Sequence, residues 1–249
     1  MIQSLDRGIQ ILMILAEKSS AGVTELAEAL GVDKSTASRL VETLRGRDMV
    51  RVDPETKKYR LGFRILHLSE SLKDNLNVIA IARPMLLSLS AQINESVHFC
   101  AYNNSSVYVM DQVRSSKNYA LSAHVGMVEP LHCSSVGKCI LAYRRPDTIR
   151  ALLEDYTFTK YTERTITAQE ALLENLAQIR SLGYALDDEE MAPGVCCIAV
   201  PVYDYRNSVR FSIGVSGPKA SLNPATIEAY VKRMAETAKK LSAAIGSTR

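Results

Sequence analysis

The chain contains no tryptophan and only four phenylalanines, and it lacks the features that mark several large classes of protein. No apolar run approaches the roughly 18 residues of a membrane-spanning helix, so we expect no membrane span. The N-terminus carries Asp6 and Arg7 and only a short apolar run at 11–16, so we expect no secretory signal peptide. There is no low-complexity tract and no internal repeat.

Cysteine is also sparse, with five residues, an odd number, at no regular spacing. This pattern predicts reduced thiols in the cytoplasm and not a disulfide framework. There is no C-x-x-C and no histidine pair at ligand spacing, so we expect neither a metal site nor a cofactor. An enzyme is not predicted, because Cys–His catalysis needs two side chains adjacent in space. The candidate residues for such an enzyme, and for a zinc site, are His98, His124, His132, Cys100 and Cys133.

The excess of positive charge is small, with 30 Lys and Arg against 27 Asp and Glu. It gathers between Asp33 and Gly62, where eight Lys or Arg face five Asp or Glu, a local charge of +3. Such a concentrated bias favours site-specific binding over a general coating of nucleic acid. The length of 249 residues exceeds most single cores and predicts two domains.

The segment from Thr24 to Gly62 has the pattern of a winged helix-turn-helix. Two short helices meet at Gly31-Val32, and the second has an apolar stripe at 37, 40, 41 and 44 that would pack inward. Asp33 stands in its first turn. Hydroxyls and cations near a helix start suit phosphates and base edges. The predicted DNA contacts on these helices are Thr24, Lys34, Ser35, Thr36, Ser38, Arg39 and Arg45.

The hairpin that follows, from Val50 to Gly62, is the predicted wing. Apolar and basic residues alternate along it with the period of a half-buried strand, around turn residues at 53–56. Its outward face adds Arg51, Lys58 and Arg60 to the predicted DNA contacts. The alternatives are a solvated face, an edge hairpin protected by its charges, and a winged helix that binds protein.

Helical spacing of Leu5, Ile9, Leu12, Leu15 and Ala16 predicts a first helix that completes a three-helix core. The chain is again mostly helical from residue 63 to about 92, with interruptions at 74–75 and at 83–84, where Pro84 stands. We therefore divide the chain into a DNA-binding domain (1–62), a linker helix (63–75) and a second domain (76–249).

The second domain is predicted to be α+β, with helices flanking an antiparallel sheet that can hold a small ligand. Strand patterns occupy 97–102, 107–113, 195–202 and 209–216, and 120–131 is extended or loop-like. Helical patterns occupy 136–143, 146–155, 169–182 and 224–245.

Three features of this domain suggest a binding site. If strands 195–202 and 209–216 pair, their small faces, with Cys197, Gly214 and Ser216, can form a pocket floor; close helix–sheet packing is the equal alternative. Serines at 134–135 can cap a helix whose start attracts a carboxylate. The acids at 187–190 are expected to be mostly solvated, with one able to reach inward. Further wall candidates, which could equally be core, are Tyr102, Tyr108, Met110, His124 and Met127.

Four motifs in this order resemble the IclR family of bacterial transcription regulators over nearly the whole chain. They are the helix-turn-helix with its wing, Leu131–Lys138, the block 187–202, and Val215–Pro218. The resemblance implies a GAF-like effector domain and an assembly of dimers or dimers of dimers. It maps an effector site onto Ser135, Gly137, Lys138, Asp187, Cys197, Gly214 and Ser216.

One departure from the family pattern is Gly214, where members often carry a second serine; it removes a hydroxyl and adds space. We expect a repressor that reads a pseudo-palindromic operator in double-stranded DNA and answers to a small organic or aromatic acid. An acid beside Asp187 requires that this carboxyl meet a hydroxyl or be protonated.

Overall fold

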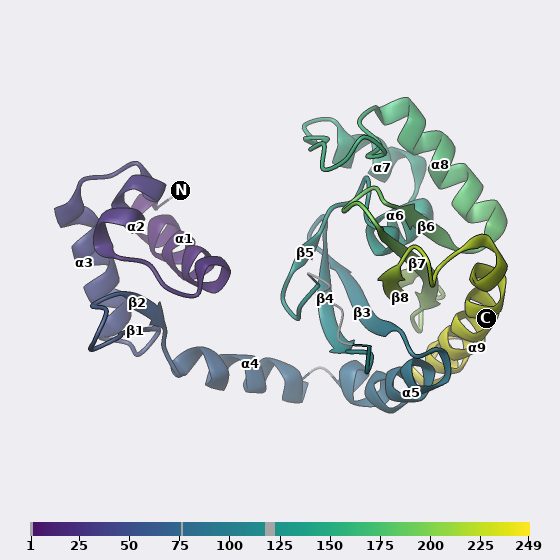
Figure 1. The fold of residues 1–249 in the computed structure, drawn as a ribbon, viewed down its shortest axis with the longest axis horizontal. Helices are drawn as coiled ribbons and strands as arrows, with labels where there is room; N and C mark the ends of the chain where they lie inside the picture. Colours follow the sequence, from purple (N-terminus) through teal and green to yellow (C-terminus); the bar gives the residue numbers. More distant parts are fainter. Residues whose placement is uncertain (1, 76, 118–122) are drawn as a thin grey trace. The chain divides into compact units, whose positions relative to one another are not determined.

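The computed structural model describes residues 2–75, 77–117 and 123–249. The chain divides into two compact units, Met1–Leu76 and Asn77–Arg249, and each is described here by itself (Figure 1). Within the described residues, no helix is long and apolar enough to cross a membrane.

The N-terminal unit is a three-helix bundle with a two-stranded wing. Its elements are α1 (Gln3–Lys18), α2 (Val23–Leu30), α3 (Lys34–Arg45), β1 (Val50–Val52), β2 (Tyr59–Leu61) and α4 (Arg64–Asn75). Gly31 ends α2 in the left-handed conformation, with φ of 62°, which suits glycine because it has no Cβ to clash. The strands pair antiparallel. The predicted winged helix-turn-helix is therefore confirmed.

The core of this unit confirms the stripe of α3 but corrects the inward face of α1. Ala37 and Val41 are fully buried, whereas Leu5 and Ile9 are 62% and 48% exposed. Leu15 is buried and Leu12 half-buried in this core as predicted, and Ile11, which the predicted stripe did not include, is buried as well. The apolar residues of α1 surround much of the helix, so spacing alone did not identify the buried side.

The C-terminal unit is built on a six-stranded antiparallel sheet in the order β5-β4-β3-β8-β7-β6. The strands are β3 (Ser96–Asn103), β4 (Ser106–Val113), β5 (Val128–Glu129), β6 (Ala185–Asp188), β7 (Val195–Tyr203) and β8 (Val209–Pro218). The helices are α5 (Asn77–Ile93), α6 (Ser135–Ala142), α7 (Pro146–Leu153), α8 (Gln169–Leu182) and α9 (Pro224–Ala244). The α+β class is confirmed.

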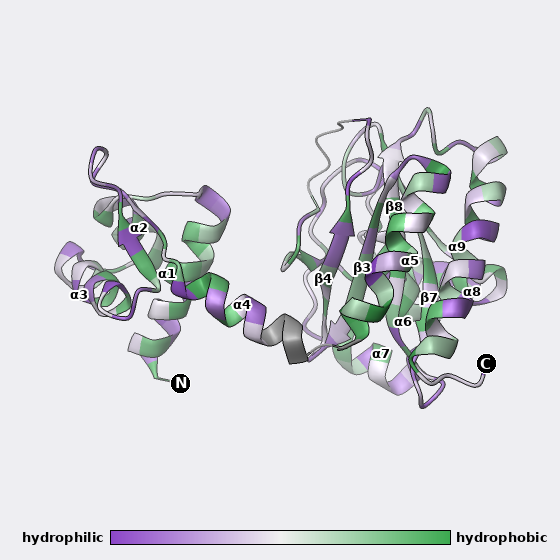
Figure 2. Cartoon of the chain, turned by 90° about the horizontal axis from the view of Figure 1, so that it is seen from below, coloured by the Kyte–Doolittle hydropathy of each residue, from purple (hydrophilic) through white to green (hydrophobic). Residues whose placement is uncertain are grey.

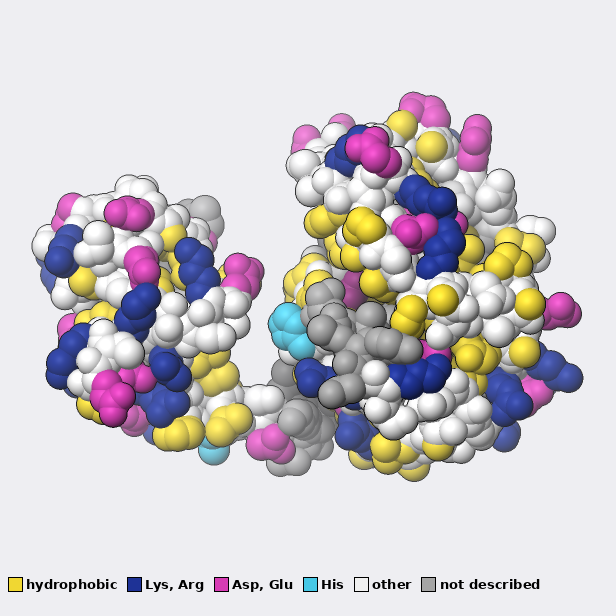
Figure 3. Space-filling model, in the orientation of Figure 1, with side chains coloured by type: hydrophobic (Ala, Val, Ile, Leu, Met, Phe, Trp, Pro, Cys, Tyr) yellow, Lys and Arg dark blue, Asp and Glu magenta, His cyan; other side chains and the backbone are white. Residues whose placement is uncertain are grey.

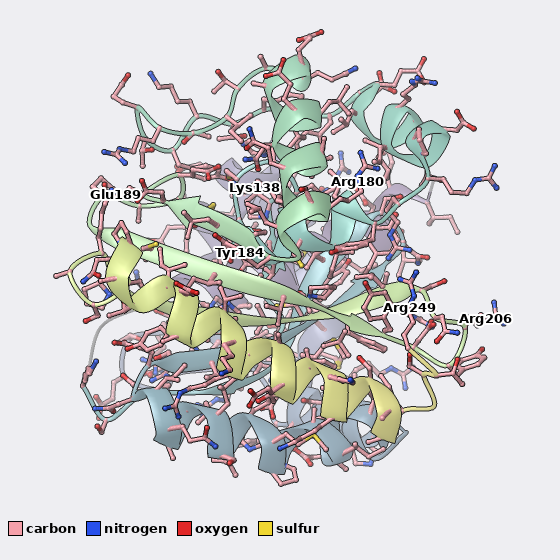
Figure 4. The ribbon with its side chains drawn as sticks, turned by 90° about the vertical axis from the view of Figure 1, so that its right-hand side faces the viewer. Lys138, Arg180, Tyr184, Glu189, Arg206 and Arg249 are labelled. Carbon is pink, nitrogen blue, oxygen red and sulfur yellow. The ribbon has the colours of Figure 1, made fainter. Side chains whose placement is uncertain are left out.

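The sheet separates two apolar cores. Helices α5 and α9 cover one face around Phe99 and Ile198, and α6, α7 and α8 cover the other around Val109 and Leu141. Figure 4 shows α5 and α9 on one side of the sheet and α8 on the other. Helices α5 and α6 are mostly green in Figure 2, and every residue of α6 is buried, so it forms the centre of its layer.

Two expectations are corrected. Pro84 lies inside α5 without interrupting it, and the acids at 187–188 belong to an unexpected strand, β6. Strand β5 was expected only as part of an extended or loop-like segment. Residues 118–122 lie outside the described chain, so the expectation for 120–131 can be compared with the structure only from residue 123 onwards.

Candidate DNA-binding surface and ligand cavity

The start of α3 is organised by Asp33. Its Oδ1 accepts hydrogen bonds from Ser35 Oγ (2.6 Å) and the Thr36 N–H (2.8 Å), and its Oδ2 accepts one from Thr36 Oγ1 (2.7 Å). These bonds hold the pKa of Asp33 well below its usual value, and the bond from Ser35 has the largest effect. They do so because they favour the charged carboxylate. The hydroxyls of Ser35 and Thr36, two of the four predicted to contact DNA, thus bond to the capping carboxylate of the helix.

The predicted cations fall into two groups. Arg45, Lys58 and Arg60 form ion pairs with Glu42 (2.6 Å), Glu25 (3.2 Å) and Asp53 (3.1 Å). Figure 3 accordingly shows cationic and acidic side chains intermingled on the visible face of this unit.

Lys34 and Arg39 form the second group: both are exposed, and neither has a carboxylate within ion-pair range among the described residues. Thr24 is exposed and Ser38 half-buried, while the Arg51 guanidinium lies 5.0 Å above the Phe63 ring. Lys57, which follows the turn of the wing, is also exposed and was not among the predicted contacts.

A cavity of about 250 Å³ lies between the start of α6 and the sheet. Four of the seven predicted effector residues line it: Ser135, Asp187, Cys197 and Ser216. Its wall is completed by residues from β3, the segment leading into β5, β5 itself, the cap and first turn of α6, the loop after β6 and the start of β7. These residues are His98, Ala123, Met127, Glu129, Ser134, Val136, Met191, Ala192 and Val195.

The remaining three predicted effector residues lie behind this wall as the structure describes it. A Cβ on Gly214 would come within 2.3 Å of His98 Nε2 and 2.7 Å of Val136 Cγ1, so this glycine permits close packing of α6 on the sheet. A Cβ on Gly137 would meet the Pro130 carbonyl oxygen at 2.3 Å. Lys138 is fully buried and is ion-paired with Glu190. The packing alternative therefore holds for Gly214, and the space gained by the missing serine is filled by His98.

The acids after residue 186 are less solvated than expected. Asp187 is 1% exposed and Glu190 7%, and Asp187 Oδ1 accepts the Glu190 N–H (2.7 Å) and the Met191 N–H (3.3 Å). Burial raises the pKa of Asp187 to about 6 and that of Glu190 to about 7, because desolvation disfavours the charged form. Asp187 thus holds the loop after β6 against the cavity.

Two further titratable groups, His98 and Glu129, line the cavity and were not among the predicted effector residues. Burial raises the pKa of Glu129 and lowers the pKa of His98 to about 4, so His98 is neutral at physiological pH. Its Nδ1 is buried and has no hydrogen-bond partner among the described residues. His98 lies opposite Gly214 because β3 pairs with β8. The alternation of residues in the sequence did not predict which strands pair.

The wall is rich in hydrogen-bonding groups but holds no cation among the described residues. Ser216 Oγ donates to Cys197 Sγ (3.1 Å), and Ser134 Oγ accepts the Gly137 N–H (3.0 Å) as the cap of α6. Of the further wall candidates, Met127 lines the cavity, whereas Tyr102 lines different hollows. No group of three His, Cys, Asp or Glu in the described chain is placed to hold a metal ion.

A winged helix-turn-helix combined with an α+β unit is an architecture of DNA-binding transcriptional regulators. Comparison with known proteins gives the family. The model of the IclR helix-turn-helix domain matches residues 4–54, and that of the bacterial transcriptional regulator IclR C-terminal domain matches residues 71–243. The chain belongs to the IclR family of DNA-binding transcriptional regulators.

Curated relatives match the sequence over nearly the whole chain. The HTH-type transcriptional regulator KdgR of Escherichia coli is 32% identical over 98% of this chain and 93% of its own. The transcriptional repressor IclR of Escherichia coli is 31% identical over 100% and 92%. A solved IclR transcriptional regulator from Alicyclobacillus acidocaldarius has a TM-score of 0.85 at 27% identity, covering 99% of this chain and 100% of that one. These relatives are regulators of transcription, a non-enzymatic family.

Proposed function

We propose that the chain is a repressor that binds a pseudo-palindromic operator as a homodimer or dimer of dimers in the cytoplasm. In this proposal residues 1–62 bind DNA, 63–75 form the linker helix, and 76–249 bind the effector. The observation that carries it is the pair of exposed cations, Lys34 and Arg39, that lack carboxylate partners in the described chain. Unpaired cations at the start of a recognition helix favour phosphates and base edges.

We further propose that the effector is a small organic or aromatic acid bound in the cavity at the start of α6. No acceptor among the described residues takes the N–H groups of Ser135 and Val136, so both are free to donate to a carboxylate. The rest of the acid would face Met127 and Met191, with a ligand hydroxyl or a proton on Asp187. Effector binding would change operator affinity by its differential affinity for the two arrangements of the dimer.

Footprinting on the DNA upstream of the protein's own gene tests the DNA part. We expect a protected region containing an inverted repeat, because two symmetric recognition helices contact equivalent half-sites. Arg39→Ala and Ser38→Ala should weaken protection by about tenfold or more each if they contact bases, since a base contact contributes about 1–3 kcal/mol. Protection without an inverted repeat, or unchanged by both substitutions in a folded protein, would contradict the assignment.

A thermal-shift screen of small organic and aromatic acids tests the effector part, because a ligand that binds only the folded chain raises its melting temperature. Hits should lose their effect in Ser135→Pro, which removes one donor N–H at a helix position that tolerates proline. Ser221→Ala, away from the cavity wall, is the control. A hit that shifts Ser135→Pro as much as the wild type binds elsewhere.

A further inference from the structure

The C-terminal unit has a second hollowed region, separate from the effector cavity. Two hollows of about 350 and 390 Å³ share Tyr102, Arg144 and Ser208 in their walls. They lie where the end of α6, the β3–β4 turn, the β7–β8 turn and the C-terminal residues meet. Figure 4 shows Arg206 and Arg249 together at this end of the unit, with Glu189, in the loop beside the effector cavity, at the opposite end.

The walls of these hollows are strongly basic. Five arginines line them, against one acid, Asp204: Arg144, Arg145, Arg206, Arg210 and Arg249. Asp204 is 8% exposed, and its Oδ1 accepts the N–H groups of Arg206 (2.9 Å) and Ser208 (3.0 Å). It is therefore engaged in its own turn. Across the described residues, no carboxylate lies within ion-pair range of these five guanidiniums.

Three of the guanidiniums are held over tyrosine rings. The distances to the ring centroids are 4.0 Å for Arg144 over Tyr102, 5.3 Å for Arg206 over Tyr205, and 5.0 Å for Arg249 over Tyr203. Stacking fixes the plane of a guanidinium and leaves its N–H edge available for paired hydrogen bonds to a phosphate or carboxylate. The hollow thus presents oriented donors and not only loose positive charge.

The guanidinium of Arg144, in the wall shared by the two hollows, is only partly supplied with hydrogen-bond acceptors. Its Nη2 donates to the Val209 carbonyl (2.8 Å), but its Nε is buried and has no partner in the described chain. Burial lowers the pKa of Arg144, because its charge is partly desolvated. A bound anion would replace the lost solvation, since buried charges are normally paired.

The C-terminal residues are fixed to this region by Asn207 in the β7–β8 turn. Its Nδ2 donates to Thr248 Oγ1 (2.9 Å), and its Oδ1 accepts from Ser247 Oγ (2.9 Å). These bonds place Arg249 at the wall. At the rim, Tyr205 is 65% exposed, so a large part of a flat aromatic surface is available for stacking by a ligand ring.

We propose that the two hollows form one binding site for a nucleoside phosphate, whose phosphates pair with the arginines and whose base stacks on Tyr205. Phosphate suits the site because guanidinium forks match its geometry. A ligand with an aromatic base suits the site better than a bare polyphosphate, because only the base would stack on the exposed ring of Tyr205. This site is independent of the effector cavity and of operator binding.

Isothermal titration calorimetry of the full chain with ATP, in magnesium-free buffer, tests the proposal. The double variant Arg145→Gln/Arg210→Gln changes two exposed side chains and should bind ATP at least tenfold more weakly. The control Arg150→Gln/Arg180→Gln removes the same charge from exposed positions on α7 and α8 and should bind as the wild type does. If both double variants weakened ATP binding equally, the loss of affinity would come from the lower net charge alone, and the proposed site would be wrong.

Two further arms test the ring and the location. Tyr205→Ala should weaken ATP binding at least threefold more than it weakens tripolyphosphate binding, because the substitution also frees the Arg206 guanidinium that the ring holds. Equal affinity of the wild type for both ligands would overturn the nucleoside assignment. Lys34→Ala/Arg39→Ala should leave ATP binding unchanged, and its loss there would assign the nucleotide to the DNA-binding surface. Absence of any ATP binding by the folded wild type would overturn the proposal outright.

Discussion

Lys138 of α6 and Glu190 of the loop after β6 form an ion pair in which the lysine is fully buried. The pair joins the helix behind the cavity to the loop in front of it. Glu190 also stands beside Asp187, whose Oδ1 accepts its N–H. The lysine predicted to meet an effector therefore neutralises a protein carboxylate, so the proposed acid would have to find other donors.

Replacing Lys138 by methionine should destabilise the C-terminal unit by about 3–5 kcal/mol, because Glu190 would lose its buried counter-ion. The measurement is urea unfolding followed by circular dichroism, since the chain has no tryptophan. Lys160→Met is the matched control: its pair with Glu163 is exposed, so the loss should stay below about 1 kcal/mol. Adding Glu190→Gln to Lys138→Met should recover part of the stability, and equal effects of the two single variants would contradict a buried pair.

Stability should fall as pH rises through the titration of Asp187. Its pKa in the folded chain is raised from 3.8 to about 6 by burial, so the folded state binds this proton more tightly than the unfolded state. The stability from that proton is fully present below pH 3.8 and is lost as pH rises through about 6. The loss amounts to roughly 3 kcal/mol by the usual conversion of a pKa shift.

The check is the difference in unfolding free energy between about pH 5 and about pH 8 for the wild type and Asp187→Asn. The asparagine keeps the oxygen that accepts the Glu190 N–H but does not titrate, so its decrease should be smaller. Burial raises the pKa of Glu190 as well, which leaves a residual decrease of the same sign in the variant. Identical pH dependence in both proteins would refute the assigned shift.

The fold could be predicted from sequence where one local pattern decided the outcome. Alternation placed Cys197 and Ser216 on one face of paired strands, and the structure pairs them directly. Local pattern failed where burial depended on distant residues. Leu5, Ile9 and Leu15 share one predicted stripe of α1, yet only Leu15 of these three is buried, together with Ile11 from outside the stripe.

The lining of the cavity was predicted in part for the same reason. Sequence neighbours identified the α6 cap, but only the sheet order brings His98 and Glu129 to the cavity. The acids near residue 187 have the composition of a solvated turn, and burial was decided by pairing of β6 with β7. Pro84 predicted an interruption from the cost of a lost hydrogen bond, and the packing of α5 on the sheet and α9 outweighs that cost.

Gly214→Ala should destabilise the C-terminal unit by about 1–3 kcal/mol through overpacking. The added methyl would lie 2.3 Å from His98 Nε2 and 2.7 Å from Val136 Cγ1, so α6 must shift away from the sheet. Gly8→Ala is the control, because nothing lies within 4 Å of a Cβ there and alanine favours the helix. It should be neutral or slightly stabilising. A melting temperature unchanged in Gly214→Ala would show that α6 has room to move.

The salt dependence of operator binding should separate the two groups of cations on α3. If Lys34 contacts a phosphate, Lys34→Ala should reduce the slope of log K against log salt by about one, because one fewer counterion is released on binding. Arg45→Ala should change the slope less, since Glu42, 2.6 Å away, already neutralises that guanidinium. Fluorescence anisotropy of a labelled operator at several salt concentrations measures both. A larger change for Arg45→Ala would mean that the ion pair opens on DNA and that the arginine, not Lys34, contacts the backbone.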